Sequence, residues 1–240
     1  MKAAYVGIAA SSVFWVLFGS IAHARPLVVI DPGHGGSNPG ASGSVAGVVE
    51  KRVTLAVARR VRELVIAKGI DVVMTRDDDR TLTLRQRTAR ADELGADLFV
   101  SIHANASPTR TQRGYETYVL TPAGVDVDAR AIRGDLATPR PGLDATTAAV
   151  LDDVERGAAQ WDAAELAASI QSHLRAARGD DGDRGVRQDA QHVLLGATMP
   201  GVLVEIGFID HPVEGKELVE PEVQDAIAHA IADAIVARVE

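Results

Sequence analysis

Hydrophobic residues along the chain fall into two kinds of stretch, short β-branched runs and longer segments with apolar positions three or four residues apart. The short runs predict β-strands at residues 27–31, 69–75, 96–103, 114–120 and 200–208. The longer segments predict amphipathic helices at residues 50–68, 84–94, 163–177 and 221–240. Strands separated by helices need crossover connections, so the pattern predicts an α/β fold with a twisted mixed sheet of about six strands and helices on both faces.

Length and charge narrow the class of protein. A chain of 240 residues with 46% hydrophobic residues is long enough for one sizeable core and too short for two ordinary domains. Its formal net charge is -8 and its pI is about 5.4. We therefore expect a single domain with no nucleic-acid partner, because nucleic-acid binding draws on clustered Lys and Arg.

The first 24 residues have a different composition from the rest. Lys2 precedes an apolar run over residues 6–18, and small residues flank His23 at the end of the segment. This layout is typical of a cleaved secretory signal. A membrane anchor is the alternative, but the run is shorter than the roughly 20 residues that span a bilayer. We expect a mature chain of residues 25–240, exported to the periplasm or cell envelope and without a membrane span. Since the chain has no cysteine, it depends on no disulfide.

Residues with potentially catalytic or metal-binding side chains lie at or after the ends of the predicted strands. In α/β sheets the ligand crevice lies beyond the carboxyl ends of the strands. His34 follows the first strand, His103 ends the third and Glu205 lies in the last. Glu50 shares the face of the first helix that carries Val53, which should pack on the sheet. A carboxylate there is costly unless a cation compensates it, so a metal ion at this edge is one interpretation.

The glycine-rich stretch DPGHGG at residues 31–36 allows another interpretation, a phosphate-binding loop. The Lys and Ser or Thr of the phosphate-loop pattern are missing, and the dinucleotide pattern is unmatched. Two imidazoles and a carboxylate with one open position suit a catalytic zinc ion, which activates water and polarises a carbonyl. Glu205 would then be the general base. From the residues alone, incidental structural histidines remain the alternative.

Seven ordered motifs carry a resemblance over nearly the whole predicted mature chain. They are DPGHGGSNPGASG, EKRVTLAVA, VVMTR, LRQR, ADLFVSIHANA, GYETYVL and PGVLVEIGFID. In this order they resemble the zinc-dependent N-acetylmuramoyl-L-alanine amidases of bacterial cell walls. The resemblance implies that His34, Glu50 and His103 bind one Zn²⁺ and that Glu205 is catalytic. It also implies the substrate, the amide between N-acetylmuramic acid and L-alanine in peptidoglycan.

Several residues are expected to have structural roles. His211 stands near the place where the family usually has an Asn, and we expect a capping role rather than a substrate contact. We expect Asn105 to support its loop and Arg76 and Arg87 to pair with carboxylates. We expect His192 to lie away from the cleft.

Residues 121–162 form an insertion whose first half is rich in Pro, Gly and Asp, without apolar periodicity, and whose second half contains a stretch suited to a short helix, TTAAVLDDVERGAAQW at residues 146–161. Members that resemble the cell-division amidases carry an insertion here, whose helix covers the zinc cleft until an activator protein displaces it. We expect a related regulatory lid or activator-binding element. Two other functions remain open: a zinc-dependent peptidase or deacetylase that acts on cell-wall material, and a wall-binding module without catalysis.

Overall fold

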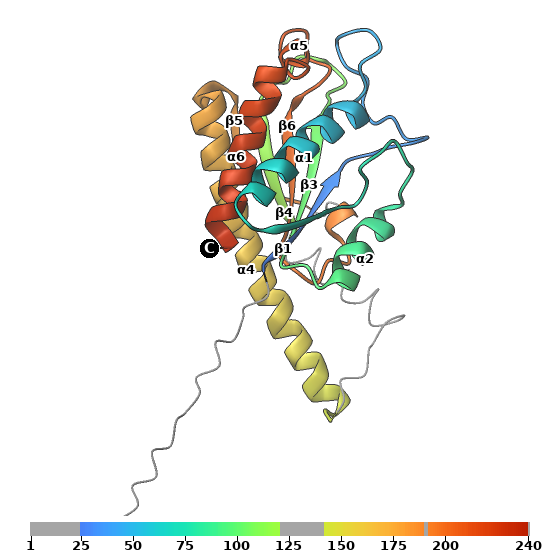
Figure 1. Cartoon of the computed structure of the whole chain (residues 1–240), viewed down its shortest axis with the longest axis vertical. Coiled ribbons are helices and arrows are strands. Elements are labelled where there is room, and N and C mark those ends of the chain that lie inside the picture. The colour runs from blue at the N-terminus through green and yellow to red at the C-terminus, as the bar shows by residue number, and fades with distance from the viewer. Residues whose placement is uncertain (1–24, 121–141, 190–191, 240) are drawn as a thin grey trace, which may run out of the picture.

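Six strands form one mixed sheet in the computed structural model, which describes residues 25–120, 142–189 and 192–239 (Figure 1). The strands are β1 (Leu27–Pro32), β2 (Asp71–Met74), β3 (Leu98–Asn105), β4 (Tyr115–Leu120), β5 (Asp183–Asp189) and β6 (Gly201–Phe208). Their order is β2-β1-β3-β6-β4-β5. The first four in this order are parallel, β4 pairs with β6 antiparallel, and β5 pairs with β4 parallel.

Helices cover both faces of the sheet. The elements are α1 (Glu50–Ala67), α2 (Leu84–Leu94), α4 (Ala145–Arg178), α5 (Glu214–Glu217), α6 (Pro221–Val239), and the 3-10 helices η1 (Asp180–Gly182) and η2 (His192–Leu194). The larger core lies under α1, α4 and α6, and a smaller one lies under α2 and η2. The α/β fold with about six strands and helices on both faces is therefore confirmed.

Burial explains why the central strands read as continuous apolar runs. In β3, Phe99 and Val100 point to opposite faces, and both are fully buried because each face carries a helical layer. The layer of α2 and η2 is short. It covers Phe99 and Leu203, whereas His103 in β3 and Glu205 in β6, which follow on this face towards the carboxyl ends of the strands, are not part of this core.

The structure differs from the sequence prediction at two elements. The predicted helix at 163–177 is the second half of α4, which begins at Ala145 and continues through Gly157 without a break. β5 was not predicted, because its sequence DRGVRQD has no apolar alternation. As an edge strand exposed over much of its length, it needs none.

The described part of the insertion lies at the edge of the sheet opposite the carboxyl ends of the parallel strands. Asp162 lies with Pro26, Leu98 and Pro200, which precede or open β1, β3 and β6. From there the first half of α4 extends away from the sheet (Figure 1). The predicted signal segment and residues 121–141 lie outside the described residues. Within the described ranges, no helix has the length and apolar character needed to cross a bilayer.

Candidate metal centre

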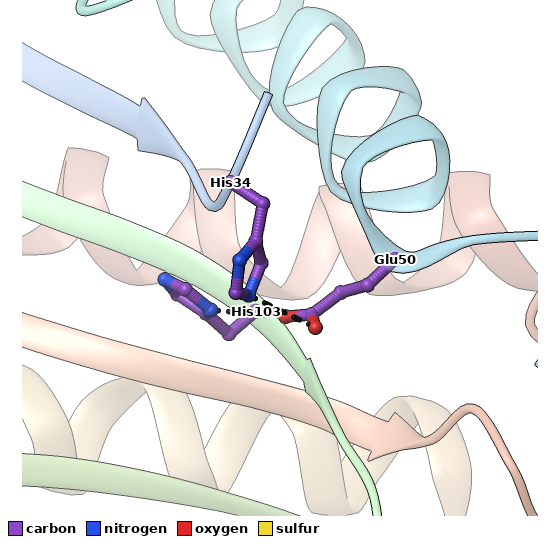
Figure 2. A group of neighbouring side chains, drawn as sticks. All are labelled: His34, Glu50 and His103. Carbon is purple, nitrogen blue, oxygen red and sulfur yellow. Dashed lines mark hydrogen bonds and ion pairs between the residues drawn. The ribbon is translucent and has the colours of Figure 1, made fainter. Parts of the chain in front are cut away.

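Three of the predicted residues meet at the carboxyl end of the sheet (Figure 2). His34 comes from the loop after β1, His103 from β3, and Glu50 from the first residue of α1. One donor atom from each lies within 4.8 Å of the others. His34 Nε2 is 3.0 Å from Glu50 Oε2, and His103 Nδ1 is 2.9 Å from Glu50 Oε1. The carboxylate therefore lies between two imidazoles.

Charge in this cluster is strongly coupled. Burial raises the pKa of Glu50, but hydrogen bonds and charge from His103 and His34 outweigh it and hold that pKa well below its usual range. Burial lowers the pKa of His34, but its hydrogen bond and charge interaction with Glu50 outweigh this, and the net pKa is raised. The carboxylate therefore stays ionised and favours a positive charge between the two rings.

Backbone and side-chain hydrogen bonds fix the orientation of the three residues. Glu50 accepts the backbone N–H groups of Ala41 at 2.9 Å and Ala104 at 3.1 Å, one on each carboxylate oxygen. His34 Nδ1 lies 3.1 Å from Asn38 Oδ1, which leaves Nε2 for the cluster. Partners of this kind set the tautomer and the ring orientation of a metal-binding histidine.

Two glycines are required near the cluster, because side chains of the cluster lie where their Cβ atoms would be. A Cβ on Gly33 would lie 2.4–2.6 Å from three ring atoms of His103. A Cβ on Gly40, at φ +70°, would lie 2.5 Å from Glu50 Oε2 and 2.6 Å from His34 Cδ2. His34 itself has φ 58°, an uncommon value for a residue with a side chain. The glycines of this loop therefore pack around the imidazoles, as the sequence suggested.

A buried ion pair supports the loop that carries His34. Asp31 and Arg87 are almost fully buried, and Arg87 Nη1 donates to Asp31 Oδ1 at 2.7 Å. Arg87 also donates to the carbonyl oxygens of Pro32 at 2.9 Å and His34 at 2.7 Å. Arg76 donates to Pro32 O and to Gly33 O. Arg87 pairs with a carboxylate as predicted, whereas Arg76 binds mainly backbone carbonyls.

Glu205 lies on β6 directly beside the cluster. Its Cα pairs with that of His103 across the parallel β3–β6 ladder, so the two side chains share a face of the sheet. The Oε2 atom is buried and has no hydrogen-bond partner among the described residues. Burial, with the charges of Glu50 and Glu116, raises the pKa of Glu205 well above its usual value.

The other candidate residues have structural contacts. His211 Nδ1 accepts the backbone N–H groups of Val213 at 3.3 Å and Glu214 at 3.1 Å, so it caps the short helix α5. Asn105 accepts the N–H of Ala106 at 2.8 Å and so supports its own loop. His192 is exposed on η2 and forms no hydrogen bond with the cluster within the described residues.

One buried residue near the cluster was missed from the sequence. Glu116 is 2% exposed and pairs with Glu205 across the antiparallel β4–β6 ladder. Its position inside the apolar strand GYETYVL was a usable signal, because the argument that singled out Glu50 applies equally to a charged residue in a buried strand.

A buried carboxylate between two histidines, at the carboxyl edge of an α/β sheet, is a group that could hold a divalent metal ion. Residues 28–237 match the family described as N-acetylmuramoyl-L-alanine amidase. The chain belongs to this family.

Named relatives agree with this assignment. The chain is 33% identical over 221 residues to the N-acetylmuramoyl-L-alanine amidase AmiA of Escherichia coli, covering 88% of this chain and 75% of AmiA. It is 33% identical over 223 residues to AmiC of Neisseria meningitidis, covering 88% of this chain and 52% of AmiC. The chain thus spans about half the length of that relative. The catalytic domain of the amidase CwlV from Paenibacillus polymyxa superposes with a TM-score of 0.68 at 31% identity, covering 89% of this chain and 97% of that domain.

Proposed function

We propose that this protein hydrolyses the amide bond between N-acetylmuramic acid and L-alanine in peptidoglycan, with one zinc ion held by His34, Glu50 and His103. The observation that carries the proposal is the close grouping of these three donors beside Glu205, in a chain that belongs to the amidase family.

The three residues fit zinc by chemistry and by spacing. Imidazole and carboxylate donors without a thiolate are typical of catalytic zinc sites. One donor atom from each residue lies within 4.8 Å of the others, so a single ion could contact all three. When bound, zinc would polarise the substrate carbonyl and make a water molecule acidic enough to attack it at neutral pH.

Glu205 supplies the proton transfers in this proposal. Its Oε2 atom takes the proton from the attacking water as the new carbon–oxygen bond forms, and returns it to the alanine nitrogen as the carbon–nitrogen bond breaks. Its unpartnered oxygen supports this role, because a general base must be free of competing hydrogen bonds, and burial raises its pKa, which favours the uptake of a proton. The products are a muramic acid carboxylate and a free alanine amino terminus.

A matched pair of variants tests the proposal. Purified protein is assayed for zinc by metal analysis and for products on cell wall by mass spectrometry. We expect one zinc per chain and a new alanine amino terminus. Glu205→Gln should keep the zinc and lose at least about 100-fold in turnover, because a positioned general base contributes about that factor. Glu93→Gln, an exposed change on α2, should behave as the unaltered protein.

Other products would overturn the assignment. Cleavage within the peptide stem would indicate a peptidase, and release of acetate would indicate a deacetylase. Zinc without hydrolysis in the unaltered protein would favour the wall-binding module. Retained turnover in Glu205→Gln would remove Glu205 from the mechanism.

We also propose that residues 1–24 are a cleaved export signal and that the protein acts in the periplasm or cell envelope. The basic start, the apolar run and the small residues before Arg25 support this. Amino-terminal sequencing of the exported protein should give Arg25 as the first residue. Retention of Met1 would reject cleavage.

We further propose that the insertion at 121–162 is a regulatory element that binds an activator protein. Val150, Val154 and Trp161 lie at helical spacing on α4 and are 56%, 63% and 70% exposed, an unusual amount of apolar surface for one helix face. Deletion of residues 122–158 keeps Gln160, whose side chain donates to Leu120 O. Higher turnover of the deletion variant on purified cell wall would support restraint by the insertion, and equal turnover would reject self-inhibition.

A further inference from the structure

The face of the sheet that carries His103 and Glu205 continues into a second group of charged residues. Glu116 on β4 pairs with Glu205 on β6, and Arg187 on β5 pairs with Tyr118 on β4. Paired residues and residues two apart in a strand share a face. His103, Glu205, Glu116 and Arg187 therefore form a row across four neighbouring strands. With about 4.8 Å between strands, β5 lies roughly 10 Å from β6.

Two guanidinium groups share the one carboxylate of Glu116. Its Oε2 atom is 3.0 Å from Arg184 Nε and 3.3 Å from Arg187 Nε. Its Oε1 atom accepts from Asn105 Nδ2 at 2.9 Å and from Tyr118 OH at 3.1 Å. Each carboxylate oxygen therefore has two partners. The group of one anion and two cations keeps a net charge of +1, although the whole chain carries a formal charge of -8.

The two arginines differ in how firmly they are held. Arg184 lies over the Phe208 ring, with 5.0 Å from the guanidinium carbon to the ring centroid, and its Nη2 contacts Gln112 Oε1 at 3.3 Å. Arg187 contacts Glu116 through Nε, and within the described residues its two Nη groups have no hydrogen-bond partner. Its side chain is 48% exposed. The fork of Arg187 therefore faces solvent on the same side of the sheet as the metal centre.

A purely structural role would require only one of the two arginines, because one guanidinium group is enough to neutralise Glu116 and to connect the edge strand β5 to β4. The second adds a cation whose two terminal N–H₂ groups remain available, in the geometry that binds a carboxylate through two parallel hydrogen bonds.

We propose that Arg187, held in place by Glu116 and assisted by Arg184, binds a free carboxylate on the peptide stem of the substrate. The proposal rests on the amidase function proposed above. An extended peptide advances about 3.3–3.6 Å per residue, so a span of roughly 10 Å from Glu205 corresponds to the second or third residue beyond the bond that is cut. Arg187 would thus select acidic stems over amidated ones.

Matched substrates test this selection. Three muramoyl tripeptides are compared: one with free carboxylates, one with a carboxamide at the second residue, and one with a carboxamide at the third. For the unaltered protein we expect kcat/KM to fall about tenfold for one of the two amidated substrates, the size typical of a charge-assisted hydrogen bond. The position that causes the fall identifies the residue bound.

Variants connect the preference to the residue. Arg187→Gln should lower kcat/KM for the acidic substrate about tenfold, mainly through KM, and reduce the acid-to-amide ratio to near one. Arg187→Lys should keep part of the preference, because the charge remains and the fork is lost. Arg85→Gln, an exposed change on α2, should leave all the ratios unchanged.

The outcomes separate the two proposals. Hydrolysis without an acid-to-amide preference in the unaltered protein, or an unchanged preference in Arg187→Gln, would overturn the carboxylate site and leave the amidase function standing. No hydrolysis of any tripeptide or of cell wall by zinc-loaded protein would overturn both.

Discussion

Replacing Arg87 with Met should destabilise the protein by about 3–5 kcal/mol, the usual cost when one partner of a buried ion pair is removed. The large value follows from burial: the Arg87 and Asp31 side chains are 5% and 0% exposed. Without Arg87, the side-chain hydrogen bonds left to the negative charge of Asp31 among the described residues come from two hydroxyl groups, those of Thr75 and Ser101. The carbonyl oxygens of Pro32 and His34 also lose a donor.

Urea unfolding of metal-free protein measures this loss directly. Arg90→Met, an exposed change on the same helix, is the control and should stay within about 0.5 kcal/mol. The double variant Asp31→Asn with Arg87→Met should be more stable than the sum of the single changes predicts, by about 1–3 kcal/mol, because the unpaired charge is gone. A loss below about 1 kcal/mol in Arg87→Met, or additive single changes, would refute the reasoning.

Two further predictions concern the metal centre. Gly33→Ala should fold but lose at least about tenfold in zinc affinity, because its Cβ would displace the His103 ring. The control is Gly157→Ala on α4, where no neighbouring atom lies within 4 Å of the added Cβ. Equal zinc affinity of the two variants would contradict this account. In metal-free protein, the depressed pKa of Glu50 contributes stability that is lost as the pH falls below the usual glutamate pKa of 4.5. The raised pKa of His34 contributes stability that is lost as the pH rises above the usual histidine pKa of 6.5. Glu50 and His34 should therefore stabilise the metal-free protein most between pH 4.5 and pH 6.5. Zinc should add more stability at pH 8 than at pH 5.5, because protons compete with zinc for the imidazoles. Unfolding curves with and without a chelator measure both trends, and a zinc increment that does not grow with pH would contradict the second.

The sequence predicted those parts of the fold whose side chains are buried in a regular pattern. Val53, Val57 and Val61 lie on one face of α1 and are buried against the sheet. Glu50 stood out because it broke that pattern on the same face. The converging histidines could be inferred because parallel strands bring their carboxyl ends to one edge.

The sequence could not predict elements that are stable without apolar periodicity. β5 is held by backbone pairing with β4 and by its arginines on Glu116. The sequence also predicted two separate helices, a short one at 146–161 and another at 163–177, where the structure has the single helix α4. The ion pairs of the buried acids also depend on strand register. Glu116 contacts Arg184 across the β4–β5 ladder, and the sequence pattern does not specify the register of that ladder.

Charged partners distinguish three acids at the carboxyl end of the sheet from Glu205. Asp31 has Arg87, Glu116 has Arg184 and Arg187, and Glu50 lies between two histidines. Glu205 lies among these three on the same end of the sheet and has no ion pair within the described residues. A cation fixed on Glu205 would lower its pKa and block the proton transfer proposed for it. Arginines on the neighbouring acids avoid this, because they neutralise the surrounding charge and leave Glu205 free to take up and release a proton.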